Sequence, residues 1–375
     1  MPSDPQKPLI VTVLPPREGF GPGRTGAIGL IAHRLNTQAT DSPFRTMIVG
    51  GMQTGDAFSD VPFQAATPPW WRPGNINRRY AAGVPRVLRG LSPALVEVHN
   101  RTEIALSLTA SLAPIPVSLI LHNDPQTMRA ARSPAERRRL LARLARVITV
   151  SGYLRARLMD GVACPRRDPE ILPNCIDLAA LPPGLPPDRR EKTILFVGRV
   201  VPEKAPDAFI AACALALPRL PGWRAEIIGA DRFRADSPDT AFLRGIRGSA
   251  DAAGVALLGY RDHPEVLAAM SRAAMLIMPS RWQEPFGLTA LEAMASGACL
   301  LCSTRGGLPE VGGGVAIPVD PDNPQAMAEA IVGLAQNPDR LAFLSRAGRK
   351  RAEIFDLGPT RRSLDAMRQA ILAGA

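Results

Sequence analysis

The chain has 375 residues, a formal net charge of +11, 46% hydrophobic residues and 5% aromatic residues. At about 150 residues per domain this length predicts two domains, and the hydrophobic content excludes a disordered chain. No apolar run approaches the roughly 20 residues of a membrane-spanning helix. The polar first seven residues predict no signal peptide, and five cysteines, an odd number, argue against a disulfide framework. Together these features predict a cytoplasmic protein.

The first half of the chain alternates between short apolar runs and helix-like segments. Residues 8–14 are continuously apolar, which predicts a strand buried on both faces. A glycine-rich stretch follows, and residues 27–35 have the periodicity of a helix. Further strands are predicted at 45–50, 95–98, 117–121 and 146–150. Strands that alternate with helices form a parallel sheet covered on both faces.

A proline-rich segment separates two such halves. Residues 181–187 cannot continue a helix or a central strand, so we expect a linker over 181–192. Beyond it, strands are predicted at 193–197, 224–228, 256–258, 274–278, 298–302 and 315–318. The expected fold class is α/β, with two doubly wound parallel-sheet domains, 1–180 and 193–355, facing a central cleft. The tail, 356–375, has a helical pattern and can pack back on the N-terminal domain.

The net positive charge is concentrated in the N-terminal half, because that half has fewer acidic residues. Residues 1–185 hold 22 Lys and Arg against 13 Asp and Glu, and the densest stretch, 129–146, has seven arginines and one acidic residue, Glu136. One interpretation is the solvated face of a helix that begins near Ser133. The other is a surface that attracts a phosphorylated acceptor or anionic lipid head groups, at up to about 1 kcal/mol per basic residue. Nucleic acid is not expected, because basic and aromatic residues are not interleaved.

The strongest motif lies at 279–310 and contains Glu284 and Glu292. Residues 288–296 have helical spacing, and Gly287 allows a tight turn into this helix, whose first N–H groups then lack partners. Such a helix start binds phosphate. The acid before the turn can reach the group attached to the phosphate, and the acid inside the helix can accept hydrogen bonds from a ribose diol. Alternatively, the two are an ordinary loop carboxylate and an ordinary helix-surface carboxylate.

A second motif supports the first interpretation. Residues 194–204 include an apolar strand that ends at Gly198 and is followed by Arg199 and Lys204, one of only four lysines in the chain. Open α/β sheets bind ligands beyond the carboxyl ends of their strands. Two cations at this place can neutralise a diphosphate leaving group.

Together these segments resemble the retaining GT-B glycosyltransferases of family GT4. The resemblance rests on G-R-x4-K, from Gly198 to Lys204, and on E-P-F-G-L-x-x-L-E, from Glu284 to Glu292. Residues 173–177 match a further motif, in which the family usually has glycine in place of the cysteine. The resemblance implies a GT-B fold and transfer of a sugar, with retention, from a nucleotide-diphosphate sugar to a saccharide or lipid-linked acceptor. The resemblance implies no metal and no other cofactor. Because the basic excess lies in the N-terminal, acceptor-side domain, we expect a role in lipopolysaccharide, exopolysaccharide or glycolipid synthesis at the inner face of the membrane.

Carried over by position, the resemblance assigns a donor site to this chain. It implies that Arg199 and Lys204 hold the donor diphosphate. Glu292 would hold the ribose, and Glu284 the hydroxyls of the transferred sugar. The other donor-binding positions that it implies are Gly23, Gly26, Gly198, Tyr260, Arg261, Phe286, Gly287 and the backbone N–H groups of Leu288 and Thr289. Catalytic roles fall to Arg199, Lys204, Glu284 and His122.

His122 follows the strand at 117–121 and precedes an Asn-Asp-Pro turn. From the residues alone, a turn or capping cluster explains it, because Asn and Asp before Pro are turn formers. The family often places a histidine here beside the donor sugar, with its backbone carbonyl facing the reacting carbon. His99 and Asn100 end the preceding strand and can line the same region.

The glycine-rich loop at 21–26 fits G-x-G-x-x-G formally, which raises a dinucleotide oxidoreductase as an alternative. Two features argue against it: six residues separate the preceding strand from the first glycine, and the second strand ends without an acid for a ribose hydroxyl. The resemblance instead implies that Gly23 to Gly26 lie near the donor phosphate or the acceptor.

Cys299 and Cys302 form C-x-x-C inside an apolar strand, where residues three apart point to opposite faces. Core packing is therefore expected in place of metal binding. A GT-B-fold nucleotide-sugar-binding protein or an epimerase remains the alternative function.

Overall fold

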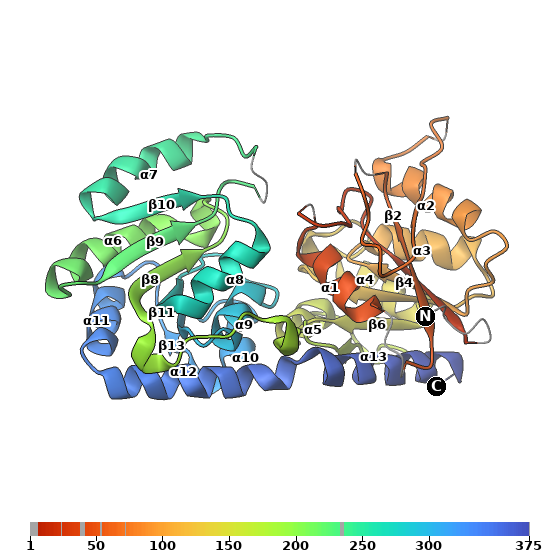
Figure 1. Cartoon of the computed structure of the whole chain (residues 1–375). Helices are drawn as coiled ribbons and strands as arrows, with labels where there is room; N and C mark the ends of the chain where they lie inside the picture. The colour runs from red at the N-terminus through yellow and green to blue at the C-terminus, as the bar shows by residue number, and fades with distance from the viewer. Residues whose placement is uncertain are drawn as a thin grey trace. The chain divides into compact units, whose positions relative to one another are not determined.

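The computed structural model describes residues 7–23, 25–37, 42–52, 55–71, 73–232 and 236–374. The chain divides into two compact units, the first formed by Met1–Cys175 with Leu357–Ala375 and the second by Ile176–Asp356. Arg24 of the predicted glycine loop and the polar residues 1–6 lie outside the described part of the chain. Each unit is a parallel sheet with helices on its faces (Figure 1).

Within the described residues the first unit has a seven-stranded parallel sheet of order β3-β2-β1-β4-β5-β6-β7. Its strands are β1 (Leu9–Val13), β2 (Arg45–Gly50), β3 (Phe63–Ala65), β4 (Leu95–His99), β5 (Val117–Leu121), β6 (Arg146–Thr149) and β7 (Glu170–Ile171). The central strands β1, β4 and β5 are buried along their whole length. Continuous apolar runs form these strands because helices cover both faces of the sheet.

Helices of the first unit cover the two faces of this sheet. Its helices are α1 (Ala27–Asn36), α2 (Ile76–Val87), α3 (Thr102–Ser111), α4 (Pro134–Arg143), α5 (Gly152–Met159) and α13 (Leu357–Leu372). Helices α2, α3 and α4 share one apolar core, represented by Tyr80, Leu108 and Leu140. Helices α1 and α13 pack against the opposite face through Ala32 and Ile371.

In the described part of the second unit, six parallel strands follow the order β10-β9-β8-β11-β12-β13. They are β8 (Glu191–Val197), β9 (Arg224–Ile228), β10 (Val255–Gly259), β11 (Ala273–Met278), β12 (Cys299–Cys302) and β13 (Ile317–Pro318). The helices are α6 (Pro206–Ala216), α7 (Ala241–Ala252), α8 (His263–Arg272), α9 (Leu288–Ala295), α10 (Leu308–Gly312), α11 (Pro324–Ala335) and α12 (Pro338–Ala352). Helices α6, α7 and α11 pack on one face, and α8 and α9 pack against each other on the other (Figure 1).

The two doubly wound parallel-sheet halves expected from the sequence are confirmed, with each predicted strand present. Strands β3 and β7 were not predicted, because three and two residues at the sheet edges are too short for a hydrophobic pattern. The expected linker, 181–192, differs from the structure, because these residues lie inside the second unit and the chain leaves the first unit at Cys175. The Leu185 amide donates to Ser271 O at 3.2 Å, so the proline-rich segment packs on its own unit.

Helix α13 belongs to the first unit, where a buried ion pair holds it. The Arg368 side chain, 2% exposed, donates to Glu97 of β4 at 2.6 Å and to Asn36 Oδ1 at 3.2 Å. Its partner Asp365, at 3.1 Å, lies on the same helix. No helix among the described residues is both long and apolar enough to cross a bilayer.

Candidate functional site

Lys204 and Glu284 form an ion pair beyond the carboxyl ends of β8 and β11. Lys204 ends a short 3-10 turn, Pro202–Lys204, and its Nζ donates to Oε1 of Glu284. The two side chains are 15% and 5% exposed. Lys204 Nζ also lies 4.7 Å from the centroid of the Trp282 ring, a cation–π contact. An ion pair is thus held at the sheet edge where α/β folds bind ligands.

Backbone contacts fix the Lys204 turn to the loop that carries Glu284. The Glu203 carbonyl accepts from the Arg281 amide at 2.9 Å and from the Trp282 amide at 3.0 Å. Arg281 also binds both carboxylate oxygens of Asp207, at 2.8 and 2.9 Å. The Asp207 carboxylate raises the pKa of Arg281 further, so this clamp stays charged. Because two loops are joined at several points, the ion pair is held in one geometry.

Helix α9 begins directly after this loop. Its N-cap, Gly287, has φ +105°, a conformation that favours glycine, and a Cβ there would lie 2.5 Å from Leu308 Cδ2. Among the described residues no side chain accepts from the amides of Leu288 and Thr289, and both residues are half-buried. The ring of Phe286 is 3% exposed and meets that of Phe355 edge to face at 5.6 Å. The helix start therefore offers free N–H donors to an anion.

Glu292 lies one turn into α9, and its side chain is 8% exposed. Its Oε1 lies 2.8 Å from Nε2 of His263, the first residue of α8. Asp262 starts α8 in a capping box with Glu265, which fixes the place of His263. Glu292 is therefore a buried, oriented acceptor close to the α9 start, as a diol-binding carboxylate requires.

The remaining donor-site candidates of this unit lie at the same edge of the sheet. Gly198 follows β8 and donates to Ile228 O at 3.1 Å, and Arg199 after it is half-buried. Tyr260 and Arg261 follow β10, where Arg261 is exposed and donates to the Tyr260 carbonyl at 3.0 Å. The structure thus pairs Lys204 with Glu284 on the loop that leads into α9, and it places these others along the same edge of the sheet.

His263 and Trp282 are site residues that the sequence analysis missed. His263 contacts a residue 29 positions away on another helix, and Trp282 lies inside the motif but contacts Lys204, 78 positions away. The rarity of the residue types was the available signal, since the chain has four histidines and four tryptophans.

The glycine-rich loop of the first unit is arranged differently. Thr25 Oγ1 accepts from the Gly21 amide at 2.9 Å, which closes the loop on itself. Glu18 Oε1 accepts from the Gly29 amide at 2.9 Å, and a Cβ on Gly26, the N-cap of α1, would lie 2.6 Å from that oxygen. The carboxylate of Glu18 therefore occupies the start of α1. The start of α1 thus already carries an anion of the chain, and a position of Gly23 and Gly26 near the donor phosphate or the acceptor stays a prediction.

His122 is buried in the first unit and pairs with His99. The two rings stack with centroids 5.0 Å apart, and His122 Nε2 lies 3.0 Å from His99 Nδ1. Asn100 Oδ1 accepts from the amides of His122 and Asn123, at 3.1 and 3.0 Å. Burial lowers the pKa of His99 to about 3 and that of His122 well below its usual value, so both imidazoles are neutral at pH 7.

The Arg-rich stretch 129–146 is only partly available to a partner. Arg137 is 2% exposed, and its guanidinium donates to the Leu158 carbonyl at 2.9 Å and the Arg132 carbonyl at 2.7 Å. Arg146 pairs with Glu170 at 2.9 Å. The exposed arginines of the stretch are Arg129, Arg132, Arg138, Arg139 and Arg143.

The thiols of Cys299 and Cys302 are buried in β12, and burial raises the pKa of both to about 12. Over the residues that the structure describes, no group of three His, Cys, Asp or Glu side chains is arranged to hold a metal ion.

The fold is that of GT-B proteins. The structure of sucrose-phosphate synthase from Thermosynechococcus elongatus superposes with a TM-score of 0.77 at 18% identity, over 98% of this chain and 100% of that one. HepE of Anabaena, solved in complex with UDP and glucose, gives a TM-score of 0.74 at 17% identity, over 96% and 99% of the two chains.

The family follows from the sequence profiles. The profile of the family described as "Glycosyl transferases group 1" matches residues 180–351, and that of "Glycosyltransferase Family 4" matches residues 38–180. The chain therefore belongs to the GT-B glycosyltransferases of family 4.

Curated relatives align over part of their length. D-inositol 3-phosphate glycosyltransferase of Segniliparus rotundus is 33% identical over 221 residues, 55% of this chain and 47% of the relative. Glycogen synthase of Mycobacterium tuberculosis is 34% identical over 195 residues, 48% of this chain and 43% of the relative. The chain thus aligns with somewhat less than half the length of these relatives.

Proposed function

We propose that the chain transfers a sugar, with retention, from a nucleoside-diphosphate sugar to an acceptor hydroxyl. The observation that carries the proposal is the convergence of Lys204, Glu284 and the uncapped start of α9 at the carboxyl edge of one sheet. A cation and free amides together suit a diphosphate. The buried carboxylates of Glu284 and Glu292 suit the hydroxyls of the sugars on either side of it.

The proposed chemistry depends on stabilising the leaving group. Breaking the anomeric bond puts negative charge on the departing diphosphate, and Lys204, Arg199 and the amides of Leu288 and Thr289 are preorganised to receive it. Once a diphosphate is bound, Lys204 has two anionic partners, the phosphate and Glu284. No protein nucleophile is part of the proposal, because the departing phosphate can take the proton of the acceptor on the same face of the sugar.

His122 is the proposed contact of the transferred sugar in the first unit. Its imidazole is buried and neutral, which does not suit a side chain that must exchange protons near pH 7. The amides of His122 and Asn123 both donate hydrogen bonds to Asn100 Oδ1, which fixes the backbone at His122. Both observations favour a role for the backbone carbonyl of His122 over a role for its ring.

We further propose that the acceptor is a saccharide carried on a lipid, handled at the inner face of the membrane during polysaccharide or glycolipid synthesis. The five exposed arginines of 129–146 support contact with anionic head groups. No bound metal is part of the proposed reaction, so activity should survive a chelator.

Binding of nucleoside diphosphates tests the site directly. We expect UDP, GDP or ADP to raise the melting temperature of the wild-type protein. Lys204→Ala should reduce transfer by about 10²–10³-fold, as removal of a preorganised charge-stabilising group does. Glu292→Ala should also reduce transfer, because it removes the carboxylate proposed to accept hydrogen bonds from the ribose of the donor. Lys192→Ala, which removes an exposed lysine from β8, is the matched control and should keep wild-type activity. Near-wild-type transfer by Lys204→Ala and Glu292→Ala would overturn the site.

A binding protein or an epimerase is the second candidate, because each would need the same donor contacts. Incubation with a nucleoside-diphosphate sugar and an acceptor preparation separates the three. Transfer gives a new glycoside and free diphosphate, an epimerase changes the sugar with the diphosphate still attached, and a binding protein leaves the donor unchanged.

A further inference from the structure

An exposed aromatic pair lies between β3 and α2, far along the sequence from the proposed donor contacts. Trp70 is 83% exposed and Trp71 59% exposed, and their rings meet edge to face at 6.0 Å. Met52, 68% exposed, accepts a hydrogen bond from Thr67 Oγ1 at 3.7 Å, so it lies beside the same loop. Exposed large apolar side chains that gather in one place mark an interaction surface.

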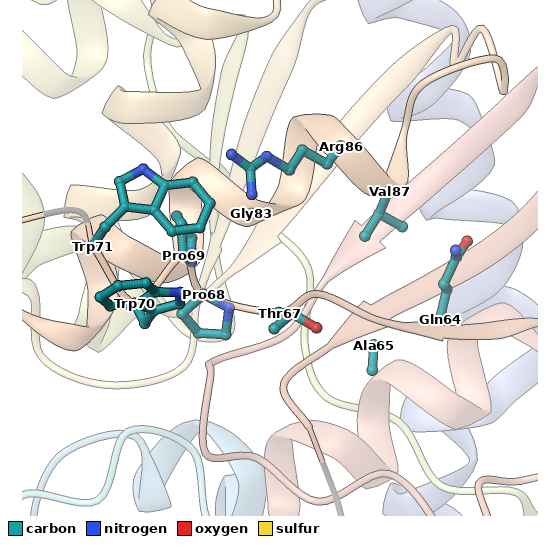
Figure 2. A pocket seen from close by; sticks show the side chains of 10 residues that line it. All are labelled: Gln64, Ala65, Thr67, Pro68, Pro69, Trp70, Trp71, Gly83, Arg86 and Val87. Atoms are coloured by element: carbon teal, nitrogen blue, oxygen red, sulfur yellow. The ribbon is translucent and has the colours of Figure 1, made fainter.

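The pair rims a pocket of about 280 Å³ (Figure 2). Pro68, Pro69 and Thr67 form its floor near the indoles, and Arg86 of α2 reaches toward them from the other side (Figure 2). The Arg86 guanidinium carbon lies 5.0 Å from the centroid of a Trp71 ring. Two prolines and a cation–π contact thus hold the aromatic pair in place while it stays exposed to water.

The surroundings of the aromatic pair are strongly basic. Residues 61–96 contain five arginines and no acidic residue, and residues 61–146 contain thirteen arginines against four acids, a net +9. Glu103 offsets one of these charges by pairing with Arg78 at 2.9 Å, whereas Arg86 and Arg89 are exposed. Helix α4, which carries exposed arginines, packs on the same face of the sheet as α2.

We propose that Trp70 and Trp71 anchor the first unit to an anionic lipid surface. Indole rings favour the water–hydrocarbon interface, where the apolar ring is buried and its N–H stays hydrated, and the nearby arginines attract the head groups. Among the described residues that line this pocket none is acidic, so no side chain there repels an anionic head group. This inference rests on one part of the proposed function, namely that the acceptor is handled at a membrane.

Vesicle binding tests the anchor. Wild-type protein should sediment with vesicles of phosphatidylcholine and phosphatidylglycerol and not with phosphatidylcholine alone, and high salt should weaken the binding. Brominated lipids should quench the intrinsic fluorescence. Trp70→Ala/Trp71→Ala should lose at least tenfold in vesicle affinity and show no quenching of its remaining tryptophans, Trp223 and Trp282. Arg86→Gln should lose about fivefold, the effect of about 1 kcal/mol per surface charge.

Phe343→Ala is the matched control, because Phe343 is a 63% exposed aromatic side chain of the second unit. It should bind vesicles as the wild type does. Wild-type protein that ignores anionic vesicles at low salt, or a double tryptophan variant that binds and is quenched as before, would overturn the proposal. So would a double variant with normal vesicle binding and a raised KM for the acceptor, which would indicate a saccharide contact instead. UDP, GDP and ADP binding, measured on the same preparations, reports separately on the proposed function, because the tryptophan substitutions do not touch the donor site.

Discussion

Helices α1 and α9 begin in similar ways and end up with different chemistry. Each follows a glycine, Gly26 or Gly287, after a loop at the carboxyl edge of a parallel sheet. At α1 the chain places the carboxylate of Glu18 on the helix start, where it accepts from the Gly29 amide at 2.9 Å. At α9 no described side chain accepts from the first amides, and the nearby carboxylate of Glu284 is bound to Lys204.

The difference shows what makes a helix start into a ligand site. Free amides and the helix dipole attract any anion, including one from the same chain. A glycine-rich turn before a helix is therefore not sufficient to make an anion-binding site. The decisive feature is whether a carboxylate of the protein already accepts from the first amides of that helix. At α9 the nearby carboxylate of Glu284 pairs with Lys204, and under the proposed function a phosphate binds the amides of Leu288 and Thr289.

The largest effect is expected from placing a carboxylate of the protein at the start of α9, as the chain does at α1, and it should fall on nucleoside-diphosphate affinity. Thr289→Asp puts a carboxylate into the first turn of α9, where it competes with a phosphate for the same amides and repels it. We expect nucleoside-diphosphate affinity to fall by at least about 100-fold, which corresponds to about 2.7 kcal/mol. The melting temperature should not fall, because an acid in the first turn stabilises a helix.

Thr289→Asn is the matched control, since it has the same shape without the charge. Calorimetric titration with UDP, GDP and ADP checks both variants. Equal affinity of the aspartate and asparagine variants would show that the α9 start does not bind the diphosphate.

Alanine at the two N-cap glycines should separate their structural roles. Gly287→Ala puts a side chain at φ +105°, with its Cβ 2.5 Å from Leu308, so we expect a loss of about 2 kcal/mol in the free energy of unfolding. Gly26 has an ordinary φ of −76°, and its Cβ would meet only the flexible end of Glu18, so Gly26→Ala should lose about 1 kcal/mol. Denaturation curves measure both. A larger loss for Gly26→Ala would contradict the comparison.

Much of the proposed donor site could be assembled from the sequence because its residues are close in sequence. Glu284, Gly287 and Glu292 lie within one loop and one helix, so their spacing alone fixes their relative positions. The strands were predictable for a similar reason, because a buried parallel strand is a continuous apolar run. The contacts of His263 with Glu292 and of Glu18 with Gly29 depend on how separate segments pack, and no local pattern encodes them.

Arg137 shows that the sequence also does not reveal whether a charged side chain is exposed or buried. In the sequence it is one of seven arginines in a basic stretch, which predicts a solvated or ligand-binding face. In the structure it is buried, and backbone carbonyls of 131, 132 and 158 accept from its guanidinium. An arginine that satisfies the carbonyls of a loop cannot be distinguished by composition from one that faces water.

Removing the charge of Glu18 at the start of α1 should change the free energy of unfolding least among these variants. Whether stability rises or falls shows whether the helix start needs a charged partner. Burial raises the pKa of Glu18, with the Gly29 amide and Arg101 opposing the shift. Between the ordinary pKa of 4.5 and this raised value the folded state binds more protons than the unfolded state, so the free energy of unfolding falls as pH rises through that window. Glu18→Gln keeps an acceptor for the Gly29 amide and has no charge to desolvate. We therefore expect it to match or exceed the wild type in stability at pH 7, by less than about 1 kcal/mol, and to show a flatter pH dependence.

Urea unfolding from pH 4 to 8, with wild type and Glu18→Gln side by side, measures that slope, and nucleoside-diphosphate affinity should be equal in the two proteins. A glutamine variant that is clearly less stable at pH 7 would mean that the start of α1 needs a full negative charge. In that case an anion at a helix start stabilises the fold even where its own desolvation opposes it. By the same reasoning, a diphosphate bound at the start of α9 would stabilise that helix, and the melting temperature would rise on nucleotide binding.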